Sequence, residues 1–165
     1  MLIIANNLGK LHFSQLMAVY EEGNRENGAE FWPELPEYQQ ILNAENEFFQ
    51  YLQEVFFAQS DAVYCILEQN GKYVSALRLE PYKDGLLLEA LETAPGYRRC
   101  GYGRKLIQAV LEQFGNQKIY SHVSKRNLPS LRIHETCAFQ RILEYAVYVD
   151  GAVNRRSCTF LYQKS

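Results

Sequence analysis

The sequence lacks any apolar run that approaches the roughly 20 residues of a membrane-spanning helix. It also lacks a charged segment followed by an apolar stretch at its N-terminus, which is the pattern of a secretory signal. These absences predict a cytoplasmic protein without a membrane partner. The 165 residues are nevertheless 47% apolar, enough for a domain that buries about two-thirds of its unfolded surface. We therefore expect residues 1–165 to form a single domain.

An excess of charge of one sign is also missing. The formal net charge is -2, from 17 basic and 19 acidic residues. Proteins that bind nucleic acid usually carry a basic field that attracts phosphates. We therefore expect no nucleic-acid partner.

Cysteine is scarce, and its four copies form no C-x-x-C pair. A domain of this size does not need disulfides, so the sequence predicts reduced thiols and no metal site. Cys100 lies beside arginines, whose positive charge favours an oxidisable thiol. No histidine stands at a spacing that suggests a cysteine nucleophile, and a bystander thiol is favoured.

Periodicity in the first 60 residues predicts a short strand over residues 2–5 and two helices. We expect the first helix to end near Gly23-Asn24, because both residue types tolerate left-handed backbone. The second helix carries apolar residues at three- and four-residue spacing, with Glu, Gln and Asn between them. We expect its apolar stripe to lie in the core: Tyr38, Ile41, Leu42, Phe48, Phe49, Leu52, Val55 and Phe56.

From residue 63 the pattern changes to strands. The ranges 63–68, 73–80 and 86–93 predict an antiparallel meander. Further along, the sequence predicts a helix ending at Gly115-Asn116, a strand over 118–123, a helix over 129–136, and strands over 141–149 and 156–162. This order indicates an α+β (mixed α/β) domain, with a sheet of about seven strands and helices on both faces.

The segment from Arg98 to Arg104 follows a predicted strand and opens a predicted helix. Its glycines allow close approach of a ligand, and a helix N-terminus offers N–H groups and partial positive charge. The pattern favours a bound anion, although R-x-x-G-x-G can also be a tight turn with solvated arginines. No lysine followed by Ser or Thr completes a P-loop, and the spacing is not G-x-G-x-x-G. A nucleotide-binding module is therefore the least favoured alternative.

This strand, loop and helix over residues 86–110 resemble the GNAT family of N-acetyltransferases. A second pattern of the family resembles residues 127–139, where Asn127 precedes a short helix that ends near Phe139. The resemblance covers residues 60–163. It implies a GNAT-like fold with a twisted, mostly antiparallel sheet, acetyl-CoA as co-substrate, and no metal. The cofactor-binding residues that it implies are Leu91, Thr93, Arg98, Arg99, Cys100, Gly101, Tyr102, Gly103, Arg104 and Asn127.

The resemblance also implies what these residues do. Backbone N–H groups over 99–104 would hold the pyrophosphate, and the splayed end of the strand over 86–93 would pair with pantetheine. Backbone N–H groups near Leu91 and Thr93 would stabilise the oxyanion. Asn127 would contact the cofactor arm.

Acetyl transfer requires a neutral amine and hence a base. Glu89 lies in an apolar strand, where some members of the family place a catalytic glutamate, and desolvation there would raise its pKa. The alternative is a structural pair with an arginine such as Arg78. Glu92 is the second candidate base. The two glutamates point to opposite faces unless a bulge intervenes.

His134 stands where the family often places a tyrosine that protonates the departing thiolate. An unperturbed histidine has a pKa of about 6.5 and donates a proton only while charged. The alternative is a packing residue, with water as the acid.

The resemblance thus predicts an N-acetyltransferase that acts by direct transfer in a ternary complex on a small-molecule or peptide amine. A catalytically weak acyl-CoA-binding sensor is the alternative. A homodimer is expected only by analogy with the family. Aromatic faces attract alkylammonium groups, so the candidate acceptor contacts are Trp32, Tyr38, Tyr82, Tyr145 and Tyr148.

Overall fold

The computed structural model describes residues 1–165. The elements are β1 (Leu2–Ala5), η1 (Leu8–Lys10), α1 (Phe13–Val19), α2 (Glu21–Phe31), α3 (Glu37–Tyr51), η2 (Leu52–Phe56), β2 (Val63–Gln69), β3 (Lys72–Tyr82), β4 (Gly85–Thr93), η3 (Pro95–Tyr97), α4 (Tyr102–Phe114), β5 (Lys118–Ser124), α5 (Leu128–Thr136), β6 (Gln140–Leu143), β7 (Ala146–Val147), β8 (Val153–Asn154) and β9 (Ser157–Tyr162). None of the helices has the length and apolar character needed to span a bilayer.

Seven strands form one sheet in the order β1-β2-β3-β4-β5-β9-β6. Only β4 and β5 are parallel; every other neighbouring pair is antiparallel. The short strands β7 and β8 form a separate ribbon. The predicted α+β class, the mostly antiparallel sheet and the meander over β2, β3 and β4 are confirmed.

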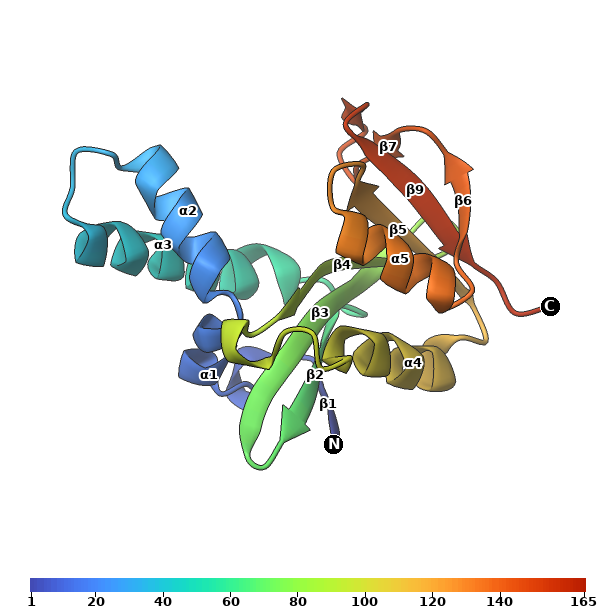
Figure 1. Ribbon diagram of the computed structural model, residues 1–165, viewed down its shortest axis with the longest axis horizontal. Helices are drawn as coiled ribbons and strands as arrows, with labels where there is room; N and C mark the ends of the chain where they lie inside the picture. The colour runs from blue at the N-terminus through green and yellow to red at the C-terminus, as the bar shows by residue number, and fades with distance from the viewer.

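Helices cover both faces of the sheet (Figure 1). On one face α4 and α5 lie over a core whose fully buried members include Leu77, Leu106, Ile107, Val110 and Phe160. On the other face α1, η2 and the end of α3 lie over a second core that includes Leu16, Val19, Leu52, Phe56 and Tyr64. The sheet therefore lies between two cores, and β4 and β5 are neighbouring strands near its middle.

The predicted end of the first helix at Gly23-Asn24 is wrong. The helical segment bends at Tyr20, and α2 then continues through both residues to Phe31. Packing against α3 holds α2 in place, because Gly28 lies so close to Gln40 that an added Cβ would collide with its backbone. Tertiary contact has overridden the weak local preference for a stop.

The predicted core stripe of the second helix is wrong in part: four of its eight residues are exposed, and these include Phe49 and Val55 in its second half. Tyr38 is 69% exposed and Leu42 is 53% exposed, whereas Leu52 and Phe56 are fully buried. Figure 1 shows the reason: α2 and the first half of α3 extend beyond the sheet as an arm, so only the end of the segment reaches the core. That end is a π-helical turn, η2.

The predicted strand over 141–149 is also corrected. The structure divides it into β6 and β7, with a bend between them, and only β6 joins the main sheet through β9. The strand predicted over 156–162 is observed as β9. A hairpin of β7 and β8, which periodicity did not predict, therefore projects beside β5 and β9.

Ala138 ends α5 in a left-handed conformation, with φ of 65°. The N–H of Phe139 donates to His134 O at 3.0 Å and that of Ala138 to Glu135 O at 3.1 Å, the Schellman pattern in which glycine is usual. Left-handed backbone costs an L-residue about 1–2 kcal/mol. We expect Ala138→Gly to raise the free energy of unfolding by about 1 kcal/mol, measured by urea denaturation.

The control for this prediction is Ala58→Gly, also exposed but without a positive φ. It is expected to destabilise by about 0.5–1 kcal/mol through the entropy of the unfolded chain. Equal effects of the two substitutions would contradict the strain at Ala138.

Candidate functional site

The site is a split in the sheet between β4 and β5. The two strands pair from Gly85 with Lys118 to Leu88 with Ser121, and no pair follows. They begin in close contact, since a Cβ at Gly85 would collide with the carbonyl of Lys118. The second half of β4 is therefore not paired with β5, and an extended ligand backbone fits along it.

A β-bulge in β4 sets the direction of the two glutamates. Ala76 pairs with Glu92 and Arg78 with Glu89, so a two-residue step on β3 faces a three-residue step on β4. Ala90, inside the bulge, has a positive φ of 53°. The extra residue brings Glu89 and Glu92 to the same face of the sheet, the face covered by α1 and η2. The alternation of a regular strand, which would place the two glutamates on opposite faces, is thus broken by the bulge.

The glycine-arginine loop opens α4 without a side-chain cap. Gly101 is the N-cap residue with φ of 79°, Arg99 has φ of 62°, and no side chain hydrogen-bonds to the first turn. The first N–H groups of a helix have no partner within it, so those of Tyr102, Gly103 and Arg104 are available to an anion. The donor set fits a pyrophosphate. The exposed guanidinium groups of Arg99 and Arg104 add positive charge.

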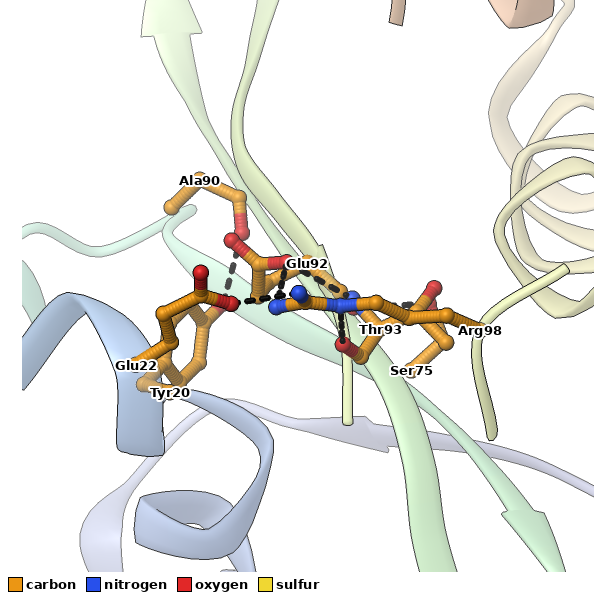
Figure 2. A network of polar contacts seen from close by, with 7 residues as sticks. All are labelled: Tyr20, Glu22, Ser75, Ala90, Glu92, Thr93 and Arg98. Atoms are coloured by element: carbon orange, nitrogen blue, oxygen red, sulfur yellow. Dashed lines mark hydrogen bonds and ion pairs between the residues drawn. The ribbon is translucent and has the colours of Figure 1, made fainter. Parts of the chain in front are cut away.

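Arg98 is directed elsewhere. Its guanidinium forms ion pairs with Glu22 of α2 and Glu92 of β4, and its Nε donates to Thr93 O at 3.3 Å (Figure 2). Its side chain therefore has carboxylate and carbonyl partners rather than an open position facing a phosphate.

Glu89 lies in a cluster of charged groups beneath η2. Its Oε1 is 3.5 Å from Arg78 Nε, and the guanidinium of Arg78 lies 4.9 Å from the ring centroid of Tyr51. Glu80, buried nearby, accepts from Gln59 at 2.7 Å. Burial raises the pKa of Glu89 to about 7, against the opposing effect of Arg78. A carboxylate with this pKa can accept a proton near neutral pH.

His134 is buried inside the protein, between α5 and the sheet. Only 1% of its surface is exposed, its Nε2 lies 2.8 Å from Ser121 Oγ, and its Nδ1 lies 2.8 Å from Ser130 O. Burial lowers its pKa. Both ring nitrogens are engaged and the neutral form is favoured, so the structure supports the packing role rather than the general acid.

We expect His134→Phe to lower the free energy of unfolding by about 1–3 kcal/mol, because it leaves the buried Ser121 hydroxyl unpaired. The lowered pKa of the folded state means that the contribution of neutral His134 is complete above about pH 6.5 and is lost as the pH falls through the folded-state pKa. Urea denaturation as a function of pH should show a flatter acid limb for the variant. A changed pH dependence of turnover would instead favour the acid role.

The remaining predicted cofactor residues line the same region in different ways. Leu91 packs toward the α4 core, and the Thr93 hydroxyl lies 3.2 Å from that of Ser75. Asn127 is exposed and caps α5, accepting from Ser130 N at 3.2 Å, so its amide NH₂ stays available to a ligand. Cys100 is exposed, with its Sγ 3.5 Å from the backbone carbonyl of Arg98.

The aromatic acceptor candidates divide into two groups. Trp32 and Tyr38 lie on the α2–α3 arm, whereas Tyr82 and Tyr148 meet at the other end of the face around His122. Tyr145, just before β7, is half-buried. A hollow of about 340 Å³ beside this second group is lined by Pro81, Tyr82, Lys83, Val147, Tyr148, Val149 and Gly151.

His122 was not among the residues predicted from the sequence. It stands one residue beyond the last β4–β5 pair, on the same face as Tyr82, whose hydroxyl lies 3.4 Å from its Nε2. Burial lowers the pKa of His122, with a smaller effect from Lys83. Alternation along β5 assigns His122 to one face of the strand. Only the register with β4 shows that this position lies beside the split.

These features together define the class of protein. The acetyltransferase (GNAT) family model matches residues 18–139. The chain therefore belongs to the GNAT family and is an acetyl-CoA-dependent acyltransferase, which confirms the resemblance found in the sequence. No curated protein matches the chain significantly.

Solved structures with this fold share little sequence with the chain. The ribosomal-protein-S18-alanine N-acetyltransferase of Escherichia coli is 19% identical with a TM-score of 0.59, over 100% of this chain and 96% of that one. The PaiA N-acetyltransferase of Thermoplasma acidophilum, solved with coenzyme A, is 13% identical with a TM-score of 0.60, over 99% of each chain. A spermidine N-acetyltransferase of Vibrio cholerae is 19% identical with a TM-score of 0.60, over 99% and 94%. At these identities the likeness establishes the fold alone.

Proposed function

We propose that the protein transfers the acetyl group of acetyl-CoA directly to a primary amine of a small molecule or peptide, in a ternary complex. The observation that carries the proposal is the split between β4 and β5, which opens beside the uncapped start of α4 and has Glu89 at its edge. In this arrangement the phosphates of the cofactor lie at the start of α4, and the acceptor amine lies at the split beside Glu89. The acetyltransferase neighbours act, by their names, on a ribosomal protein alanine and on spermidine, two different classes of amine.

The cofactor residues in this proposal act mainly through their backbone. N–H groups from Arg99 to Arg104 bind the pyrophosphate. The end of β4 from Leu91 to Thr93 pairs with the pantetheine arm and provides an N–H for the oxyanion. The amide of Asn127 donates to the cofactor arm. The uncapped helix and the positive φ values at Arg99 and Gly101 support this assignment.

In the proposed chemistry, Glu89 removes a proton from the acceptor ammonium group, directly or through water. The neutral amine nitrogen then attacks the thioester carbonyl and a C–N bond forms. As the C–S bond breaks, the nitrogen loses its second proton to water, and coenzyme A leaves as a thiolate that takes a proton from water. The raised pKa of Glu89 supports its role as the base. Both glutamates have an arginine partner, but the side chain of Glu92 is 40% exposed and that of Glu89 only 26%, which makes Glu92 the less suitable candidate.

The test begins with calorimetric titration of the purified protein with acetyl-CoA, with ATP as the control ligand. We expect binding of acetyl-CoA alone, followed by amine-dependent release of thiol in a panel of polyamines and peptides. Affinity for acetyl-CoA without amine-dependent release would support the sensor alternative, and no affinity would contradict the cofactor site.

We also propose that residues 1–165 act as one domain. The sheet supports this, because β1 and β9, which lie near the two ends of the chain, belong to the same seven strands.

A further inference from the structure

Arg98 connects three parts of the molecule that are distant in sequence. It precedes the cofactor loop, yet its side chain contacts Glu22 in the first turn of α2 and Glu92 at the bulged end of β4 (Figure 2). Its Nε also donates to the Thr93 carbonyl. The guanidinium therefore links loop, helix and strand through directed contacts.

Two hydroxyl groups complete the same network. The buried Tyr20, between α1 and α2, donates to Ala90 O at 2.6 Å, and Ser75 of β3 donates to Glu92 O at 2.8 Å (Figure 2). Together with the Arg98 contact to Thr93, three backbone carbonyls of the bulged segment accept from side chains. The position of this segment thus depends on α2 and on the cofactor loop at once.

The network does not act by stabilising the whole fold. The side chains of Arg98, Glu22 and Glu92 are 39%, 49% and 40% exposed, and ion pairs this exposed contribute little to the free energy of unfolding. Their effect is on position: they join the start of the loop over residues 99–104 to α2.

We propose that Arg98 is a positioning residue that couples the cofactor loop to α2, so that binding of coenzyme A at the loop orders α2 and the bulged end of β4. This inference rests on the proposed function, because it takes the loop over 99–104 as the coenzyme A site. It differs from a direct role of the Arg98 side chain in binding phosphate.

The test is a double-mutant cycle with coenzyme A as the titrant. We expect Glu22→Gln and Arg98→Ala each to weaken binding by about three- to tenfold, and the double variant to bind no more weakly than Arg98→Ala, since both substitutions break the same link. Arg25→Ala is the matched control, because Arg25 of α2 pairs with Glu21 of the same helix and with Glu37 of α3, and forms no ion pair with the loop. It should leave the affinity unchanged.

A direct phosphate contact predicts the opposite result for Glu22. Removing a carboxylate that competes for Arg98 would then leave the affinity unchanged or increase it, and either outcome would overturn the coupling. Absence of binding by the unaltered protein would overturn the cofactor site itself, and is distinguishable from a loss of coupling alone.

Hydrogen exchange provides a readout that a purely structural role would not alter. In the unaltered protein coenzyme A should slow exchange of amides in α2 as well as in the loop. In Arg98→Ala the loop should keep its protection while α2 loses it, and Arg98→Lys should restore part of it. If coenzyme A leaves α2 exchange unchanged in the unaltered protein, the proposal is wrong.

Discussion

Glu89→Gln is expected to lower kcat by about 10²–10⁴-fold while acetyl-CoA affinity changes little, because it removes the proposed base and leaves the phosphate loop intact. Glutamine keeps the size of the side chain but accepts no proton near neutral pH. Steady-state kinetics with a reactive amine, beside calorimetric titration with acetyl-CoA, would measure both quantities. Unaltered turnover would remove Glu89 from the mechanism and direct attention to His122.

The pH dependence of the unaltered enzyme follows from the same assignment. A base works only when deprotonated, so kcat/KM should rise as the pH rises through the pKa of Glu89, about 7. The Glu89→Gln protein should lack this rise. Glu54→Gln, at an exposed position of η2, is the matched control and should retain both the rate and its pH dependence.

Gly101→Asp is expected to abolish useful affinity for acetyl-CoA. The position is open, with nothing within 4 Å of an added Cβ, and Asp and Asn tolerate its positive φ better than most residues do. The new carboxylate would occupy the α4 N–H groups and repel the pyrophosphate, which we expect to weaken binding by about 100-fold or more. Isothermal titration would measure the loss.

Gly101→Asn is the control, since it has nearly the same shape without the charge. We expect it to weaken binding by less than about tenfold, through backbone strain alone. Thermal denaturation should show that the aspartate variant is folded, because a negative charge at a helix N-terminus stabilises the helix by about 0.3–1 kcal/mol. Equal losses for the two variants would show that the charge is irrelevant and that the loop does not bind phosphate.

The candidate site could be found from the sequence where it depends on a continuous segment. The R-x-x-G-x-G loop needs glycine at Gly101 for a local backbone reason, and it opens a helix whose apolar periodicity is clear. The apolar run of β4 likewise marked Glu89 as a charged residue among leucines. These features depend on neighbours within a few positions, which is why they were readable.

The remainder of the site depends on contacts between distant positions. The bulge that brings Glu92 to the same face as Glu89 arises from the register of β3 against β4, and His122 becomes part of the site only through the register of β5. The partners of Arg98 include Glu22, which lies on α2 and far away in sequence. His134 resembled a candidate acid in the sequence, and only its packing against Ser121 shows that it is buried.

The sequence by itself determined most of the strands and helices, the mixed architecture and the position of the glycine-arginine loop, because hydrophobic periodicity and turn chemistry are local properties of the chain. The tertiary structure decided which helix residues are buried, where α2 ends and which side chains face the split. Those outcomes follow from the relative placement of segments, as the exposed Tyr38 and the buried Phe56 show on a single apolar stripe. Only one end of that stripe has a sheet to pack against.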